Sequence, residues 1–200
     1  MISFDYEEQL HKDGFAVVCG VDEAGRGPLA GPVFAAACIL PPEFDVSGIN
    51  DSKKLTEKKR EKLFEDITHS EAIWAIGTAS EQEIDEINIL NATFLAMRRA
   101  VEGLRLKPDF VLIDGNRAPH TGLPEQTLVK GDSLSYSIAA ASIIAKVSRD
   151  RYMLELDKRY PEYCFAQHKG YGTKLHYEKL KEFGISEVHR KSFLKNLAEK

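Results

Sequence analysis

Stretches of consecutive apolar residues alternate with amphipathic segments along most of this chain. Short apolar runs that are bounded by Gly, Pro or acidic residues are typical of buried strands. They predict five strands, at about residues 16–22, 32–40, 72–80, 110–114 and 127–132. The short connection between the first two strands favours an antiparallel pair, because parallel neighbours need a longer crossover.

Apolar positions at helical spacing predict helices between and after these strands. Ser80 and Glu83 form a capping-box pattern that opens one helical region, which we expect to break near Asn88 and then resume. The Ala and Ser content of a long helix over 135–160 allows close approach to a sheet. Two shorter helices are predicted at 174–183 and near residue 192.

This order of elements predicts an α/β fold with a mixed five-stranded sheet flanked by helices, antiparallel at first and parallel later. No repeat or low-complexity linker interrupts the sequence. We therefore expect a single domain, 1–200, in which about 165–200 form a helical C-terminal cap. Functional sites in such folds lie at the carboxyl ends of parallel strands.

Acidic residues follow three of the predicted strands: Asp22 and Glu23 follow VVCGV, Asp114 ends FVLID, and Asp132 ends TLVKGD. Neighbouring side chains alternate between the faces of a strand, so Asp22 and Glu23 reach one site only if the strand stops there, as the following glycines suggest. Carboxylate oxygens suit hard cations such as Mg²⁺, and two such ions can clamp a phosphodiester during hydrolysis. The sequence thus predicts a divalent-metal site near phosphate, although each acid alone fits a solvated turn.

The charge of the chain is unevenly distributed. A formal net charge of −4 argues against capture of nucleic acid by bulk attraction, and without the four acids named above the total would be zero. Residues 51–62 carry six basic and three acidic side chains, and residues 165–196 carry seven basic and three acidic ones. Such basic runs can contact a phosphate backbone, but they more often form solvent-exposed faces of helices.

Several classes of protein do not fit this sequence. No apolar run reaches the roughly 18 residues that span a bilayer, and the N-terminal residues lack a signal-peptide pattern. The cysteines form no CxxC pair and fit reduced thiols in a cytoplasmic protein. His168, His176 and His189 lack zinc-site spacing, and we expect them to be solvated or to face phosphate.

Together these residues resemble type 2 ribonuclease H, of the bacterial HII branch. The matching motifs occur in the family's order and span most of the chain: GVDEAGRGPLAGPV (20–33), NDSKKLTEKKRE (50–61), LIDGN (112–116), KGDSLSYSIAAASIIAKVSRD (130–150) and HKGYGTKLH (168–176). The resemblance implies the ribonuclease H fold, with a mixed five-stranded sheet and flanking helices.

The resemblance also implies roles for individual residues. The family's metal-binding and catalytic acids, which take Mg²⁺ or Mn²⁺, match Asp22, Glu23, Asp114 and Asp132. The GRG element that meets the ribonucleotide-to-deoxyribonucleotide junction matches Gly25, Arg26 and Gly27, and the tyrosine that packs on the deoxyribose matches Tyr171. Phosphate contacts along the duplex are expected from Ser52, Lys53 and Lys54, and more weakly from Lys146 and Lys169; ordinary exposed lysines are the alternative.

The implied activity is endonucleolytic hydrolysis of the RNA strand of RNA–DNA hybrids and at ribonucleotides embedded in duplex DNA, leaving a 3′-hydroxyl and a 5′-phosphate. We expect these duplexes as partners, no membrane association, and a monomer. Two alternatives remain open: a non-catalytic duplex binder whose acids hold a structural ion, and a small-molecule phosphohydrolase. Basic segments long enough to follow a duplex favour the nuclease.

Overall fold

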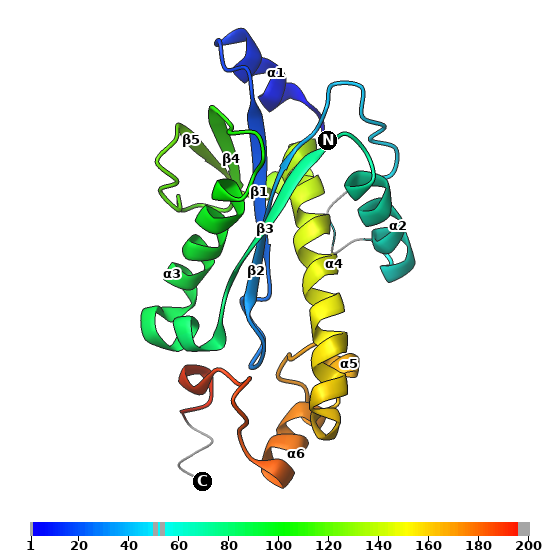
Figure 1. Cartoon of the computed structure of the whole chain (residues 1–200), viewed down its shortest axis with the longest axis vertical. Helices are drawn as coiled ribbons and strands as arrows, with labels where there is room; N and C mark the ends of the chain where they lie inside the picture. Colours follow the sequence, from blue (N-terminus) through cyan, green and yellow to red (C-terminus); the bar gives the residue numbers. More distant parts are fainter. Residues whose placement is uncertain (1, 50–51, 53–54, 196–200) are drawn as a thin grey trace.

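A five-stranded sheet forms the centre of the computed structural model, which describes residues 2–49, 52 and 55–195 (Figure 1). Its strands are β1 Val18–Ala24, β2 Val33–Ile39, β3 Ile73–Ala79, β4 Phe110–Asp114 and β5 Glu125–Leu128, in the order β3-β2-β1-β4-β5. β2 pairs antiparallel with β1 and β3, whereas β4 runs parallel to β1 and β5. The predicted mixed sheet, antiparallel at first and parallel later, is confirmed.

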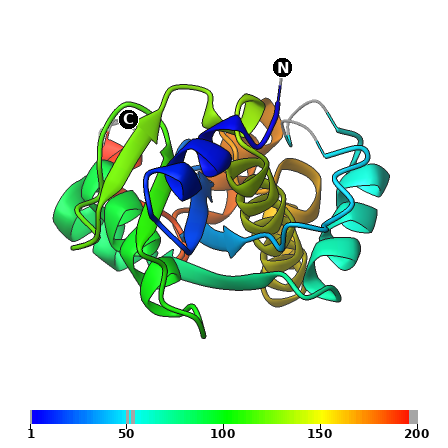
Figure 2. The same ribbon diagram turned by 90° about the horizontal axis from the view of Figure 1, so that it is seen from above.

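Helices cover both faces of this sheet (Figure 2). One face lies against α3, and the other lies against α4, with α2 packed beside α4. The helices are α1 Asp5–Lys12, α2 Glu57–Thr68, α3 Glu81–Glu102, α4 Tyr136–Arg159, α5 Phe165–His168 and α6 Lys174–Phe183. Among the described residues, none of the helices is long and apolar enough to cross a membrane.

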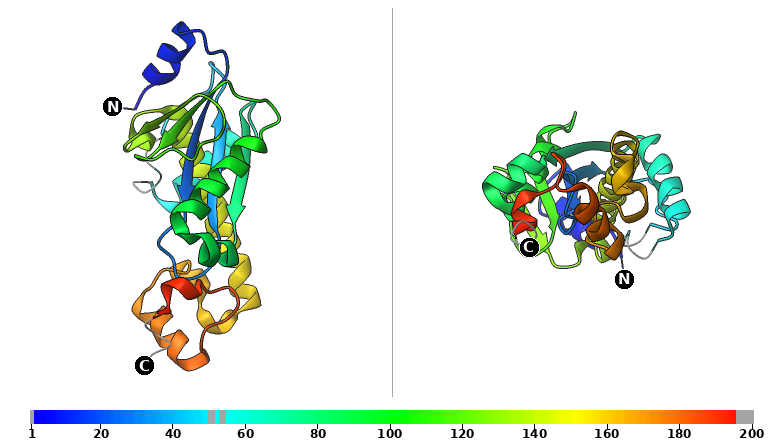
Figure 3. Two further views of the ribbon diagram at one scale, coloured as in Figure 1. Left: turned by 90° about the vertical axis from the view of Figure 1, so that its left-hand side faces the viewer. Right: turned by 90° about the horizontal axis from the view of Figure 1, so that it is seen from below.

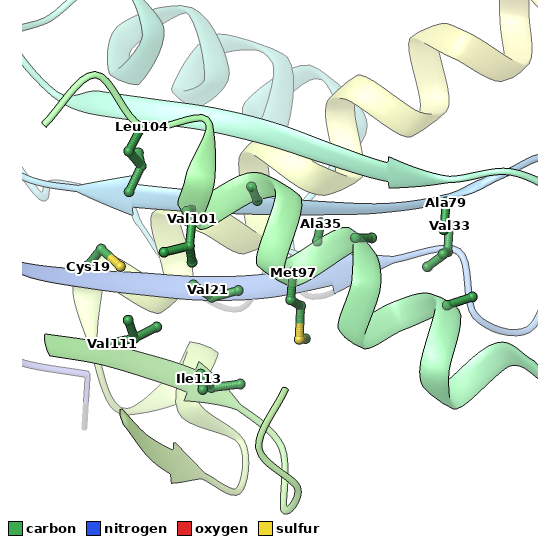
Figure 4. Packing of buried hydrophobic residues seen from close by; sticks show 14 of the residues in the cluster. Cys19, Val21, Val33, Ala35, Ala79, Met97, Val101, Leu104, Val111 and Ile113 are labelled. Atoms are coloured by element: carbon green, nitrogen blue, oxygen red, sulfur yellow. The ribbon is translucent and has the colours of Figure 1, made fainter. Parts of the chain in front are cut away.

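Burial on both faces explains why the strands read as continuous apolar runs rather than as an alternating pattern. On the α3 side, Met97 and Val101 pack over the sheet beside Val21 (Figure 4). On the α4 side, a Cβ on Gly20 would lie 2.2 Å from the backbone nitrogen of Ile138. Glycine at this position therefore allows α4 to lie directly on β1.

The start and the interruption of α3 follow from its own sequence. The Ser80 hydroxyl accepts from the Glu83 N–H (3.2 Å), and the Glu83 carboxylate accepts from the Ser80 N–H (2.8 Å). Asn88 adopts a φ of 67°, and its Oδ1 accepts from the N–H groups of Leu90 and Asn91, which restarts the helix. The predicted capping box and the predicted break at Asn88 are both confirmed.

The C-terminal segments are carried by the second half of α4, which extends past the sheet (Figure 3). Met153 and Leu156 of α4 join α5 and α6 in a separate apolar cluster, with the fully buried Phe165 among its members. Leu29 and Ala30, from the connection between β1 and β2, belong to the same cluster. The predicted helical cap is present, and it lies against the turn that follows the acids of β1.

Two strand boundaries differ from the prediction. β1 does not stop at Asp22, because its ladder with β2 continues as far as Ala24 opposite Phe34. β5 ends at Leu128, opposite the last residue of β4, and so does not reach Asp132. Asp132 instead lies in a 3₁₀ turn, η2 (Gly131–Ser133), between β5 and α4.

Candidate active site

Parallel pairing of β1 and β4 places Asp22 beside Asp114. The register aligns Val21 with Ile113, so the next residue on each strand is an aspartate, and both point to the same face of the sheet. That face is the one covered by α4, where Asp22 hydrogen-bonds the side chain of Ser142 and is only 3% exposed. A buried carboxylate and a half-buried one are thus held at the carboxyl end of two parallel strands.

The electrostatics of Asp22 fit a cation site. Burial raises the pKa of Asp22 well above its ordinary value, and the negative charges of Glu23 and Asp114 raise it further. Hydrogen bonds from Ser142 and from the Glu23 N–H (2.7 Å) act in the opposite direction. Carboxylates held this close repel one another, and a divalent cation among them would relieve that repulsion.

A backbone hydrogen bond brings Asp132 to the same end of the sheet. The N–H of Gly131 donates to Oδ1 of Asp114 at 2.6 Å, which ties η2 to the end of β4. Asp132 follows directly and is 5% exposed. Its backbone thus lies at the same end of the sheet as the two strand aspartates, in a turn rather than at the end of a strand.

Glu23 approaches from the other face of β1. Because β1 continues through it, Glu23 points away from Asp22 and toward α3. Glu23 and Asp114 line one cavity of about 320 Å³, together with Arg26. The Arg26 guanidinium lies 3.5 Å from the Glu23 carboxylate.

The prediction that β1 stops at the acids is wrong, but the four acids (Asp22, Glu23, Asp114 and Asp132) still gather at one end of the sheet. Within residues 2–49, 52 and 55–195, no three Asp, Glu, His or Cys side chains already stand in metal-binding geometry. The donor chemistry fits Mg²⁺ or Mn²⁺, since every group is a carboxylate. The metal role of the four acids stays a prediction.

The residues matched to junction recognition lie together. A Cβ on Gly27 would be 3.7 Å from the Tyr171 ring, so the turn of residues 25–27, here called the GRG turn, adjoins the loop of residues 168–173, here called the Tyr171 loop. Tyr171 is 43% exposed, and Arg26 is also exposed. Gly25 has a φ of +96°, and a Cβ there would meet Arg149 Nε at 2.0 Å, so no larger residue fits.

Ser52 lies in the interior rather than at the surface. It is 2% exposed, and its hydroxyl is 2.8 Å from that of Ser142, the partner of Asp22. Arg60 fixes the same segment by donating to the Ser52 carbonyl at 2.5 Å. The structure thus connects Ser52 to the acids through Ser142, and its predicted phosphate contact gains no support from this position.

The lysines predicted to contact phosphate have mixed outcomes. Lys53 and Lys54 lie outside the described residues. Lys146 is half-buried, and its ammonium group pairs with Asp150 at 2.7 Å. Lys169, also half-buried, donates to the backbone carbonyl of Ala166 in α5 at 2.5 Å. Phosphate contacts by these side chains remain predictions.

The three histidines of the cap are buried, so the expectation that they are solvated or face phosphate is wrong. His168 and His176 stack with ring centroids 4.2 Å apart, and Nε2 of His176 lies 3.1 Å from Nε2 of His189. Burial lowers the pKa of His176 and of His189 to about 4. The cause is the folding of the cap around Phe165, whose ring contacts all three imidazoles.

Sequence reasoning also missed the supporting residues Ser142, Arg149 and Arg190. Both arginines are almost completely buried, and they donate to carbonyls of the segment that follows β1. An isolated arginine in a helix or in a C-terminal segment carries no local signal of burial, because its partners are backbone groups distant in sequence.

Comparison with known proteins identifies the family. The chain matches the family model described as Ribonuclease HII over residues 19–196. It is 57% identical over 194 residues to ribonuclease HII of Caldicellulosiruptor saccharolyticus, an alignment that covers 97% of this chain and 95% of that protein.

Two solved structures share the fold. Ribonuclease HII of Archaeoglobus fulgidus, in a complex with PCNA, has a TM-score of 0.75 and 28% identity, covering 88% of this chain and 94% of that chain. Ribonuclease H2 of Pyrococcus horikoshii has a TM-score of 0.73 and 29% identity, covering 88% of this chain and 93% of that chain. Because the family model, a close relative and the fold agree over nearly the whole sequence, the chain belongs to the ribonuclease HII family.

Proposed function

We propose that this protein, a ribonuclease that cleaves the RNA strand of RNA–DNA hybrids, also nicks duplex DNA at embedded ribonucleotides with two divalent cations bound by the four acids. The observation that carries the proposal is the position of the GRG turn. It follows the acids of β1 directly and adjoins the exposed ring of Tyr171.

Divalent cations, when bound, would lower the pKa of an attacking water and neutralise charge on the phosphate. Asp22 and Asp114 are the side-by-side carboxylates that would hold such ions, with Asp132 approaching from η2 and Glu23 from the cavity beside α3. Ser142 orients Asp22 by a hydrogen bond, and the backbone of η2 orients one oxygen of Asp114. These contacts fix the carboxylates before substrate arrives, which reduces the cost of reorganisation.

The GRG turn supports recognition of ribose. A 2′-hydroxyl both donates and accepts hydrogen bonds, and glycine backbone can approach it closely. Asp22 and Gly25 are three residues apart, which is at most about 10 Å of chain. A ribose bound at the turn and its own 5′-phosphate held at the acids would therefore fit within this distance.

Tyr171 supports recognition of the neighbouring deoxyribose. Its ring is partly exposed and lies next to Gly27, and it can pack on a sugar that carries no 2′-hydroxyl. An extra hydroxyl beneath an aromatic ring would lose its hydrogen bonds to water. The pair of elements would thus select a ribonucleotide that is followed by a deoxyribonucleotide.

The test uses a DNA duplex that contains one ribonucleotide, incubated with the protein and Mg²⁺ or Mn²⁺. We expect a nick on the 5′ side of the ribonucleotide that leaves a 3′-hydroxyl and a 5′-phosphate, and no cleavage of the same duplex without the ribonucleotide. Cleavage of long hybrids alone would contradict the junction proposal. Binding to both duplexes without cleavage of any substrate would instead favour a non-catalytic duplex binder.

A further inference from the structure

We propose that His189 and Arg190 are positioning residues that hold the GRG turn and the Tyr171 loop in one fixed relation. Through them, the GRG turn, which would recognise ribose, and the Tyr171 loop, which would recognise deoxyribose, would act as one rigid unit. This inference rests on the proposed recognition of the junction.

Arg190 is bonded to the inner side of the GRG turn. Its guanidinium is fully buried and donates to the carbonyls of Gly25 (2.6 Å), Arg26 (2.9 Å) and Gly31 (2.9 Å). Its own backbone N–H donates to the carbonyl of Leu29 at 2.8 Å. A planar guanidinium that donates hydrogen bonds to three carbonyls fixes the orientation of their peptide planes as well as their position.

The orientation of these peptide planes has a consequence for the substrate side of the turn. The carbonyls of Gly25 and Arg26 point toward Arg190, and the described residues contain no cis peptide bond. In a trans peptide, the N–H points opposite to the carbonyl. The N–H groups of Arg26 and Gly27 are therefore directed away from Arg190, as a turn that donates to a sugar or phosphate requires.

His189 reaches the Tyr171 loop through His176. The Tyr171 carbonyl can only accept, so Nδ1 of His176, 3.0 Å away, carries a proton, and the neutral ring must accept at Nε2. Nε2 of His189 is therefore the donor across the 3.1 Å contact between the two rings. Its Nδ1 then accepts from the backbone N–H of Ser186 at 3.1 Å, which can only donate. The groups at the two ends of this series of hydrogen bonds, the Tyr171 carbonyl and the Ser186 N–H, require the same tautomers.

A second connection joins the Tyr171 loop to residues 29 and 30, which follow the GRG turn, and stabilises the arrangement. Arg149 donates to the carbonyl of Ala30 at 3.1 Å and to that of Lys169 at 3.0 Å. The Leu29 N–H donates to the Gly170 carbonyl at 2.8 Å. His189 and Arg190, however, are adjacent in the chain. His189 is connected to the Tyr171 carbonyl through His176, and Arg190 donates directly to the carbonyls of the GRG turn.

The first test replaces Arg190 with lysine, which keeps the positive charge but cannot reproduce the planar set of three hydrogen bonds to carbonyls. Arg105→Lys is the matched control, because Arg105 is exposed. We expect Arg190→Lys to lower kcat/KM for the single-ribonucleotide duplex about tenfold or more, and for a long hybrid only about threefold or less. Equal losses on both substrates, or losses that follow the melting temperature, would overturn the inference.

The second test remains informative if Arg190→Lys fails to fold. His189→Leu removes the donor to His176, His189→Gln supplies an amide donor, and His69→Leu is an exposed control. We expect His189→Leu to reduce cleavage at a single ribonucleotide selectively and His189→Gln to restore part of it. In a Tyr171→Ala background, His189→Leu should add little further loss, because the side chain that it positions is gone. A full, additive loss in that background would show that His189 acts on stability alone.

The failure of this inference and the failure of the proposed function give different results. If the unmodified protein does not cut at a single ribonucleotide, the proposed function is contradicted. If it does cut there, and neither variant changes the ratio between the two substrates, only the positioning role is contradicted.

Discussion

At the scale of single residues, Asp22 is held in an environment that disfavours its negative charge. It is buried, it lies beside two other carboxylates, and its pKa is raised as a result. Because the folded state binds the proton more tightly, ionisation of Asp22 weakens folding as the pH rises above its unfolded pKa. The side chain therefore costs stability in the absence of a cation, which is expected of a group retained for binding.

Asp22→Asn is expected to nearly abolish cleavage while leaving hybrid binding measurable. In EDTA the same substitution should raise the free energy of unfolding at pH 7, because it removes the buried charge and its repulsion. Mg²⁺ should raise the melting temperature of the unmodified protein more than that of the variant. Thermal denaturation with and without Mg²⁺, together with a cleavage assay, checks these outcomes, and retained cleavage would remove Asp22 from the site.

Ser142→Ala removes the side-chain hydrogen bond that orients Asp22 and favours its charged form. We expect cleavage to fall about tenfold, as is typical when a group that supports a metal ligand is lost. Ser148→Ala on the same helix is the matched control, because the Ser148 hydroxyl is buried without a hydrogen-bond partner in the described structure. Steady-state kinetics at saturating Mg²⁺ distinguish the two, and equal effects would contradict the role of Ser142.

At the scale of elements, local sequence predicts the parts whose hydrogen bonds are local. The capping box at Ser80 and the break at Asn88 use groups within four residues, so they can be predicted from the local sequence without knowledge of the fold. The end of β1 is different, because pairing with β2 carries the strand past the acids to Ala24. The predicted strand through Asp132 is wrong for a similar reason, because the ladder of β5 with β4 ends at Leu128, opposite the last residue of β4.

Gly20→Ala tests the close contact between β1 and α4. The added methyl group would lie within 2.2 Å of the α4 backbone, which cannot move away as a side chain can. We expect a loss of stability of about 1–3 kcal/mol or more. Gly27→Ala is the comparison, because its methyl group meets only the Tyr171 ring, at 3.7 Å, and should leave the melting temperature nearly unchanged. Chemical denaturation of both variants checks this, and a stable Gly20→Ala protein would contradict the packing.

The buried histidines of the cap make stability depend on pH. The pKa of His176 and of His189 is lowered to about 4 by burial, and each lies near another imidazole that would repel a second charge. Between this value and their ordinary pKa of about 6.5, the unfolded chain binds more protons than the folded one. Stability should therefore fall as the pH is lowered from about 6.5 to 4. Urea denaturation across this range checks the slope, and it should be smaller in His189→Gln.

At the scale of the whole molecule, the fold joins segments that the sequence keeps far apart. The GRG turn and Tyr171 are separated by more than 140 positions, yet Gly27 and the Tyr171 ring are neighbours. Motifs in the sequence suggested both elements, but not their contact. The buried arginines and histidines that join them could not be predicted, because they bond to backbone groups across the fold.

The central claim is that cleavage at the four acids depends on recognition of a junction by the GRG turn and Tyr171. Its most direct test compares the unmodified protein with Tyr171→Ala on a duplex containing one ribonucleotide and on a long RNA–DNA hybrid, at the same Mg²⁺ concentration. We predict that kcat/KM falls much more for the single ribonucleotide than for the hybrid. An equal loss on both substrates would contradict the account.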